Sequence, residues 1–302
     1  MVNWLMSHDV RGVIPPLTTP FTKEGTVYEE GLRRLLDFQI EKGSLGVFLC
    51  GTYGSGPLMS VSERKKVVEV AVDQIKKRIA TIVHVGTTNT KDSVELAKHA
   101  EENDADAVAA VPPYYYRHDE RIVLQYYKEI VKAVKIPVYV YNNPARTGFT
   151  VTPSFLNMLA DAGIKGIKDS SFSLVEFTHF LIDLAGREDF NFIIGTEALA
   201  LPALMMGAKG CISGLANAFP EPVVELYKAV MSRKYEKAAK LQLKVNEARR
   251  ILHVAHSTNA ACYAMLNERG IDVGMPKPPE LPVTTEALNQ MKKGFIRMGL
   301  LK

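Results

Sequence analysis

The sequence alternates between short apolar segments and longer amphipathic stretches, and this alternation limits the folds open to the chain. Eight apolar segments precede Met231, and each ends in a turn-rich loop. They span residues 12–18, 46–52, 81–86, 107–111, 138–142, 164–168, 192–195 and 210–214. Parallel strands are joined by crossover helices, so eight such units predict a (β/α)₈ barrel. An open doubly wound sheet is the alternative, but near-equal units and the lack of a Gly-x-Gly-x-x-Gly turn disfavour it.

Several of the amphipathic stretches carry signals that predict where a helix begins. Ser60-Val61-Ser62-Glu63 is a capping box, and Thr152-Pro153 places a cap residue before a proline at the first helical position. Phe219-Pro220-Glu221-Pro222 opens another helix in a similar way. Within residues 67–75 the apolar side chains follow the 3.6-residue period of a helix with one buried face.

The alternation stops after Met231. Residues 234–256 and 259–268 are predicted to be helices, and a final helix is predicted near 284–299. No low-complexity linker separates these helices from the preceding segments. We therefore expect a barrel over residues 1–231 and a helical extension over 232–302 within the same structural unit.

Composition excludes several classes of protein. The chain has 302 residues, of which 47% are hydrophobic, which is enough for one large core. The net charge is +4 with basic and acidic residues interspersed, so a nucleic-acid partner is not expected. Cys50, Cys211 and Cys262 lie far apart without a Cys-x-x-Cys pair, which favours a reducing compartment over disulfides or zinc.

Targeting signals are not evident either. Residues 1–10 lack a cationic region followed by an apolar one, and no apolar run approaches the length of a membrane span. The expectation is therefore a cytoplasmic protein without a membrane partner.

Lys168 ends the sixth apolar segment. If residues 164–168 are extended, Ile164, Gly166 and Lys168 share one face. An ammonium held against apolar surroundings loses hydration and its pKa falls, so the amine becomes a nucleophile suited to Schiff-base chemistry on a ketone. The alternative is an ordinary solvated lysine.

The loops that follow the apolar segments contain further polar side chains. In a (β/α)₈ barrel these loops meet at one rim and form the active site. They are residues 18–20, 51–56, 112–117, 141–148, 168–169, 195–197 and 212–214. Hydroxyl groups, tyrosines, a lysine and an arginine therefore converge on one rim.

Each of these groups also has a structural interpretation. Tyr141 can be an ordinary strand aromatic, and the tyrosines at 114–116 can belong to the core or a subunit interface. The glycines of residues 51–56 can supply positive φ in a turn, or their backbone N–H groups can bind a carboxylate. Arg146 can be a surface charge, although it lies on a tight loop beside the predicted site.

Four motifs occur together and in a fixed order. They are Gly51-Thr52-Tyr53-Gly54, Pro113-Tyr114-Tyr115, Tyr141-Asn142-Asn143-Pro144-Ala145-Arg146-Thr147-Gly148 and Gly166-Ile167-Lys168-Asp169. This combination resembles the dihydrodipicolinate synthase / N-acetylneuraminate lyase family of pyruvate-dependent class I aldolases, from residue 12 to the loop at 278–279. The resemblance implies a (β/α)₈ barrel with a C-terminal helical extension, assembled as a homotetramer built from two tight dimers.

The resemblance also implies roles for individual residues. Lys168 would form the Schiff base with pyruvate, and Tyr141 would be the acid/base. Thr52 and Tyr115, the latter from a neighbouring subunit, would complete a proton relay. The backbone of Thr52 and Tyr53 would hold the pyruvate carboxylate. Gly195 and Ile212, which lie in the seventh and eighth segments, are further candidate substrate-binding residues.

This chemistry requires no metal or organic cofactor. The iminium nitrogen at Lys168 is the electron sink that turns the pyruvate methyl group into a nucleophile. The phenol of Tyr141 can then protonate the aldehyde oxygen as the carbon–carbon bond forms. The expected partners are therefore pyruvate and an aldehyde co-substrate.

The motifs give conflicting indications of the aldehyde. Most family members have Gly-Thr-Thr-Gly-Glu or Gly-Ser-Thr-Gly-Glu, whereas Tyr53 and Ser55 stand here in place of a hydroxyl residue and the acid. The run 54–57 is similar to that of archaeal 2-keto-3-deoxygluconate aldolases. Arg146, in contrast, matches the arginine with which dihydrodipicolinate synthases hold aspartate semialdehyde. The main hypothesis is an aldolase for 2-keto-3-deoxy sugar acids, and the alternative is a dihydrodipicolinate synthase.

Other functions are less consistent with the motifs. A 2-keto-3-deoxy-acid dehydratase would use the same iminium to expel water. A non-catalytic paralogue has no reason to keep Lys168 together with Tyr141, Thr52 and Tyr115. A phosphosugar isomerase would need a glutamate base and a phosphate-binding glycine loop, for which residues 195–197 give little support.

Overall fold

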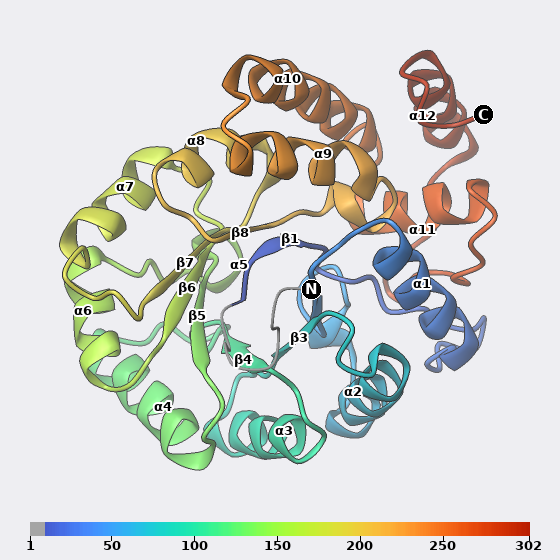
Figure 1. The fold of residues 1–302 in the computed structure, drawn as a ribbon. Helices are drawn as coiled ribbons and strands as arrows, with labels where there is room; N and C mark the ends of the chain where they lie inside the picture. Colours follow the sequence, from blue (N-terminus) through green and yellow to red (C-terminus); the bar gives the residue numbers. More distant parts are fainter. Residues whose placement is uncertain (1–9) are drawn as a thin grey trace.

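Eight parallel strands form a barrel surrounded by helices (Figure 1). The structure is a computed structural model that describes residues 10–302, so the signal-peptide expectation falls almost entirely outside the described residues. The strands are β1 (Gly12–Ile14), β2 (Gly46–Leu49), β3 (Ala80–His84), β4 (Ala107–Ala110), β5 (Val138–Asn142), β6 (Gly166–Asp169), β7 (Asn191–Ile194) and β8 (Gly210–Ile212). The predicted (β/α)₈ barrel is confirmed.

The sheet order is β1-β8-β7-β6-β5-β4-β3-β2, and all recorded pairs are parallel. Backbone hydrogen bonds between the first and second strands complete the ring. The Leu45 N–H donates to the Val13 carbonyl at 3.0 Å, and the Phe48 N–H donates to the Pro15 carbonyl at 2.9 Å. The carboxyl ends of all eight strands therefore face one rim.

Helices follow the strands around the barrel. They are α1 (Glu29–Glu41), α2 (Val61–Ile75), α3 (Thr90–Glu102), α4 (Glu120–Ala133), α5 (Pro144–Thr147), α6 (Pro153–Asp161), α7 (Leu174–Asp183), α8 (Ala200–Met205) and α9 (Pro220–Met231), with short 3₁₀ turns at Gly56–Leu58, Glu197–Leu199 and Leu215–Asn217. The predicted starts are confirmed. Ser60 and Glu63 form both bonds of the capping box, and Thr152 caps α6 with Pro153 in its first turn.

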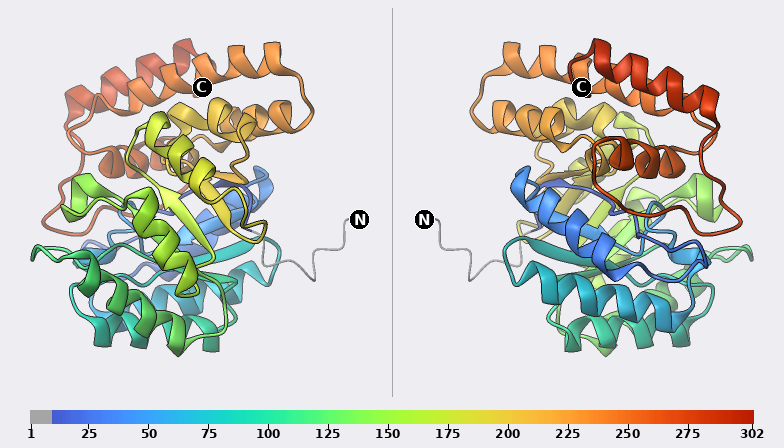
Figure 2. Two further views of the ribbon diagram at one scale, coloured as in Figure 1. Left: turned by 90° about the vertical axis from the view of Figure 1, so that its left-hand side faces the viewer. Right: turned by 90° about the vertical axis from the view of Figure 1, so that its right-hand side faces the viewer.

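Three further helices follow α9. They are α10 (Tyr235–Leu252), α11 (Thr258–Glu268) and α12 (Thr285–Arg297), close to the predicted ranges. Figure 2 shows α10 and α12 stacked on one side of the barrel, beyond α9. The Phe219 and Phe295 rings stack with centroids 4.1 Å apart, which joins the last helix to the start of α9.

Most strands are shorter than their apolar segments. The first strand ends at Ile14 because Pro15 and Pro16 have no N–H to donate to a ladder. The second ends at Leu49, so the prediction that Cys50 lies within a strand is wrong: Cys50 has a φ of 56° and begins a turn. The residues that follow these strands therefore belong to the rim loops.

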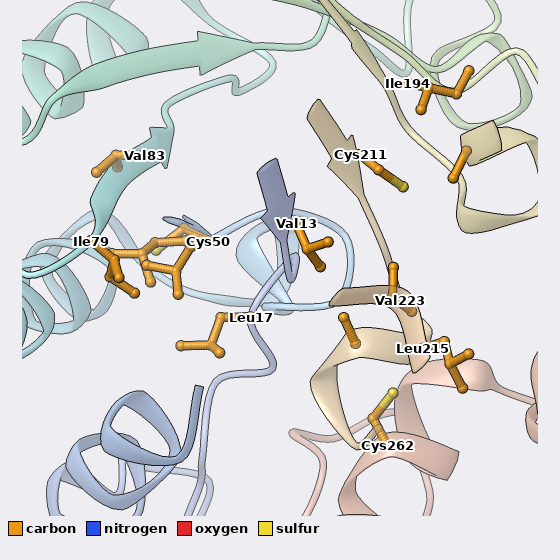
Figure 3. Packing of buried hydrophobic residues seen from close by; sticks show 14 of the residues in the cluster. Val13, Leu17, Cys50, Ile79, Val83, Ile194, Cys211, Leu215, Val223 and Cys262 are labelled. Carbon is orange, nitrogen blue, oxygen red and sulfur yellow. The ribbon is translucent and has the colours of Figure 1, made fainter. Parts of the chain in front are cut away.

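Buried apolar side chains form two clusters. One lies inside the barrel and includes Phe48, Tyr139, Tyr141 and Ile212. The other lies between the strands and the helices, and Figure 3 shows part of it, with the three cysteines at separate places. All three thiols are buried and free.

In the part of the chain that the structure describes, no helix combines the length and the apolar character that crossing a membrane requires.

Candidate active site

Lys168 lies inside the barrel near the carboxyl end of β6. Its side chain is buried, and Nζ lies 3.9 Å from the centroid of the Phe48 ring and 3.8 Å from that of Tyr141. Burial lowers the pKa of Lys168 below the ordinary value of a lysine, although the neighbouring Tyr141 acts in the opposite direction. The neutral amine is therefore favoured relative to that of a solvated lysine.

A glycine leaves space for an aromatic ring beneath this lysine. Gly166 shares the interior face with Lys168, and a Cβ at Gly166 would lie 2.4 Å from a ring carbon of Tyr139. The absence of a side chain allows the Tyr139 ring to pack there. A small cavity in this region is lined by Lys168 together with Tyr139, Phe48 and Ile212.

Tyr141 stands beside Lys168 because the two residues are direct partners in the β5–β6 ladder. Its hydroxyl shares a hydrogen bond of 3.2 Å with Thr52 Oγ1 and accepts one of 2.9 Å from Asn143 Nδ2. Burial acts to raise the pKa of Tyr141, but Lys168 and the bonds from Thr52 and Asn143 outweigh it, so the pKa lies below its ordinary value. The phenol is thus connected to a hydroxyl at the rim.

The glycine-rich loop after β2 presents unused backbone donors. Among the described residues, no hydrogen bond is formed by the backbone N–H of Thr52 or of Tyr53. The Tyr53 hydroxyl donates to Thr258 Oγ1 of α11 at 3.0 Å, and burial raises its pKa well above that of a free tyrosine. The Tyr53 side chain therefore joins the loop to the C-terminal helices and has no partner in the Lys168–Tyr141 cluster.

Arg146 lies on the short helix α5, immediately after β5. Its side chain is exposed, and none of the ion pairs formed within residues 10–302 involves it. Its guanidinium is therefore not neutralised by a carboxylate of the described chain.

Of the four predicted catalytic residues, Tyr115 is the one that the structure does not bring to the Lys168–Tyr141 cluster. It is 86% exposed, and its ring contacts only Tyr116 edge-on among the described aromatic pairs, at 5.1 Å between centroids. Its φ of 80° is in the left-handed region, which a tyrosine rarely adopts. Strained backbone of this kind concentrates at functional sites and costs about 1–3 kcal/mol.

The two remaining candidates lie at strand ends around Lys168. Gly195 follows β7 directly, and its N–H donates to the Asp169 carbonyl at 2.7 Å. Ile212 ends β8 and lines the cavity named above.

Three residues next to Tyr141 were not singled out by sequence reasoning. Asn143 donates to its hydroxyl, and the rings of Phe48 and His84 meet its ring edge-on at 5.6 and 5.8 Å between centroids. His84 ends β3, and the rule that strand ends form the site could have found it. Asn143 lies within a conspicuous motif, but nothing in the sequence shows that its amide reaches the phenol.

No group of three or more His, Cys, Asp or Glu side chains in the described chain is arranged to hold a metal ion. The fold and the cluster together define a class: a (β/α)₈ barrel protein with a buried lysine of lowered pKa on β6 and, beside it on β5, a tyrosine whose hydroxyl is hydrogen-bonded to a threonine. The chain belongs to the dihydrodipicolinate synthetase family, whose model matches residues 9–296.

Individual relatives agree with this membership. A 4-hydroxy-tetrahydrodipicolinate synthase from Methanopyrus kandleri is 31% identical over 98% of this chain and 99% of its own length. One from Methanothrix thermoacetophila is 33% identical over 96% of this chain and 97% of its own. Among solved structures, YagE, a prophage protein of the dihydrodipicolinic acid synthase family from E. coli K12 in complex with pyruvate, superposes with a TM-score of 0.92 at 28% identity, covering 96% of this chain and 99% of its own.

Proposed function

We propose that this protein is a pyruvate-dependent enzyme that works through a Schiff base on Lys168. The observation that carries the proposal is the buried amine of Lys168 beside the Tyr141 phenol, which is itself bonded to Thr52. Membership of the dihydrodipicolinate synthetase family and the pyruvate complex of YagE support it.

In the proposed reaction the neutral amine of Lys168 attacks the keto carbon of pyruvate, and water leaves as the iminium forms. The methyl group then loses a proton, which the Tyr141–Thr52 relay carries to solvent, and an enamine forms because the iminium nitrogen accepts the electron pair. The enamine carbon then bonds to the aldehyde carbon, and Tyr141 donates its proton to the aldehyde oxygen. Thr52 passes a proton back to Tyr141, and water releases the product from Lys168.

Pyruvate also needs a site for its carboxylate. The free N–H groups of Thr52 and Tyr53 are suited to it, since successive backbone donors in a turn form a concavity that binds anions. In this proposal the carboxylate lies on the glycine-rich loop, with the keto carbon directed at Lys168.

For the aldehyde, the comparisons support the alternative better than the expected 2-keto-3-deoxy sugar acid. Both relatives described above are named 4-hydroxy-tetrahydrodipicolinate synthase. Arg146 agrees with that activity, because an exposed guanidinium without a carboxylate partner can bind the carboxylate of aspartate semialdehyde. We therefore propose condensation of pyruvate with aspartate semialdehyde as the first candidate.

A 2-keto-3-deoxy sugar acid remains the second candidate because of Tyr53. Its hydroxyl is bonded to Thr258, so the second hydroxyl of the usual family loop is missing from the Lys168–Tyr141 cluster. An aldehyde that is recognised through its own hydroxyl groups depends less on that position.

Tyr115 leads to a proposal about assembly. Because its exposed ring lies outside the cluster of its own chain, we propose that it completes the relay in a second copy, within a dimer of a homotetramer. The strained backbone at Tyr115 supports a functional reason for its position.

One experiment tests the class and another the substrate. Borohydride added with pyruvate should trap an adduct on the peptide that contains Lys168, and an adduct elsewhere, or none, would contradict the Schiff base. Incubation with pyruvate and either aspartate semialdehyde or glyceraldehyde, followed by mass spectrometry, should show a product with the semialdehyde. Product from glyceraldehyde alone would favour the second candidate.

A further inference from the structure

His84 is a buried residue next to the proposed acid/base that the mechanism above does not use. It ends β3 on the interior face of the barrel and is 3% exposed. Its ring meets the Tyr141 ring edge-on, with an interplanar angle of 85°. A buried imidazole at this place has either a packing role or a role that acts through its hydrogen bonds.

The two ring nitrogens contact the backbone at the ends of the strands on either side. Nδ1 lies 3.1 Å from the Cys50 carbonyl, after β2, and Nε2 lies 3.3 Å from the Val111 backbone nitrogen, after β4. A carbonyl accepts and an N–H donates, so the proton is on Nδ1 and Nε2 accepts. His84 is thus a neutral bridge between two rim loops.

The electrostatics around the ring agree with this neutral form. Burial lowers the pKa of His84 well below its ordinary value, and the Arg64 guanidinium and, to the extent that it is protonated, the Lys168 side chain lower it further. Arg64 Nη2 lies 3.5 Å from Nδ1, and because a guanidinium cannot accept a hydrogen bond, it does not compete with Cys50 for the Nδ1 proton.

The Cys50 carbonyl is the important contact because it belongs to a strained turn. Cys50 has a φ of 56°, a left-handed conformation that costs about 1–3 kcal/mol in a residue other than glycine. The turn is also crowded, since a Cβ at Gly56 would lie 1.9 Å from the Cys50 oxygen. In the described chain His84 is the donor to this carbonyl.

The same turn directs the rim loop that carries Thr52. Two residues after Cys50, Thr52 Oγ1 reaches the Tyr141 hydroxyl at 3.2 Å. A change in the Cys50 conformation rotates the chain that leads to Thr52 and alters this distance. His84 therefore contacts the Tyr141 ring directly and is connected to Thr52 through the Cys50 turn.

We propose that His84 is a positioning residue that holds the Cys50 turn and thereby keeps Thr52 within hydrogen-bonding distance of Tyr141. This inference rests on the proposed function, because it assumes that the Thr52–Tyr141 bond carries a proton. It implies that His84 sets the rate of carbon–carbon bond formation and leaves Schiff-base formation with pyruvate unchanged.

Two substitutions separate the two hydrogen bonds of the ring. In His84→Asn the amide N–H lies near the position of Nδ1 and can still donate to Cys50. In His84→Gln the longer side chain places its amide near Nε2, and the bond to Cys50 is lost. His84→Asn should keep kcat within about threefold of the wild type, whereas His84→Gln should lower kcat about 10- to 100-fold, because a displacement of about 1 Å in a catalytic group can cost about 10²-fold.

Val83→Ala is the matched control for loosening of β3. Val83 precedes His84 and packs in the outer cluster between the strands and the helices. This variant should unfold more easily than the wild type with kcat unchanged. A kcat loss in Val83→Ala equal to that of His84→Gln would show that general loosening of the strand, and not the bond to Cys50, is responsible, and would overturn the proposal.

A double-mutant cycle with Thr52→Val supplies the decisive readout. If His84 acts through Thr52, His84→Gln should cost nothing further in kcat once Thr52→Val is present. Multiplicative losses would overturn the proposal. A kcat loss of more than tenfold in folded His84→Asn would also overturn the proposal. This second criterion still tests the proposal if His84→Gln does not fold.

The borohydride adduct distinguishes failure of this inference from failure of the proposed function. Wild type and all His84 variants should give the adduct with pyruvate at similar rates. Absence of the adduct in the wild type would refute the proposed function itself. A normal adduct together with kcat values that do not follow the Asn and Gln pattern would refute only the role of His84.

Discussion

The two halves of the proposed site differ in how they are held. Lys168 and Tyr141 stand side by side on adjacent strands inside the barrel, and both are buried within one chain. Tyr115 stands on a loop after β4, is exposed, and occupies a strained backbone conformation. Groups on strands packed from both sides are positioned by the core, whereas a loop residue is positioned by whatever it contacts.

This contrast implies a division of work. The inner half, which is Lys168 and Tyr141 with the Phe48 ring beside them, needs no second copy for Schiff-base formation, because the amine and its apolar surroundings come from one chain. The outer half, Tyr115 and Arg146 at the rim, is proposed to connect the phenol to solvent and to bind the aldehyde, with Tyr115 coming from a second copy. Substitutions in the inner half should therefore have larger effects than substitutions in the outer half.

The largest effect is expected from Lys168→Ala, which should abolish both the pyruvate adduct and turnover. The wild-type adduct should also form at lower pH than with an ordinary lysine, since the neutral fraction rises through a pKa that burial has lowered. Adduct yield measured by mass spectrometry across pH checks both statements. A yield that rises only near the pKa of a free lysine would contradict the second.

Tyr141→Phe should be next in size. The ring keeps its packing on Phe48 and His84, but the hydroxyl bonded to Thr52 is lost, so pyruvate should still form its adduct. Turnover should fall about 10²–10⁴-fold, the usual contribution of a positioned acid/base. Steady-state kinetics measures the loss of turnover, and mass spectrometry of the trapped adduct measures Schiff-base formation separately. Turnover close to wild type in this variant would assign the proton to another group.

Arg146→Ala should affect only the outer half. Hydrogen bonds to a charged group contribute about 1.5–3 kcal/mol, so kcat/KM for aspartate semialdehyde should fall by about one to two orders of magnitude. The pyruvate adduct should be unchanged. With glyceraldehyde the loss should be about tenfold or less, because neutral hydrogen bonds are weaker. Equal losses for both aldehydes would remove Arg146 from carboxylate recognition.

Mixing subunits tests whether the outer half crosses between chains. Tyr115→Phe protein, impaired in turnover, and inactive Lys168→Ala protein should together be more active than either alone, because an intact Lys168 then meets an intact Tyr115 from its neighbour. Activity of verified mixed dimers measures this. The absence of any recovery would place the whole relay within one chain and remove the contrast between the halves.

The smallest effect is expected on the stability of the outer half. Tyr115→Gly removes an exposed ring and relieves a left-handed backbone, so the free energy of unfolding should stay the same or rise by about 1 kcal/mol. Phe48→Ala, in the inner half, should instead lower it by about 3–5 kcal/mol. Denaturant titration of both variants measures the difference, and a large destabilisation by Tyr115→Gly would show that this loop supports the fold of its own chain.

The barrel, and the rim that carries the proposed site, could be predicted from the amino-acid sequence alone. Eight alternating segments have few ways to bury their apolar faces, and caps such as Ser60 act within one turn of helix, so local patterns were sufficient. Lys168 could be singled out for the same reason, because strand alternation places its side chain on a face shared with Gly166.

Which side chains contact one another could be learned only from the folded structure. His84, at the end of β3, bridges the two rim loops that begin at Cys50 and Val111, and no periodicity encodes these contacts. Cys50, which was predicted to be strand, instead forms a left-handed turn whose carbonyl contacts the His84 ring and lies against Gly56. In the sequence Tyr53 stands where family members have a hydroxyl residue of the substrate pocket, but in the structure its hydroxyl is bonded to Thr258 of the distant helix α11. Contacts between residues far apart in the chain depend on packing geometry, and packing is a property of the folded whole.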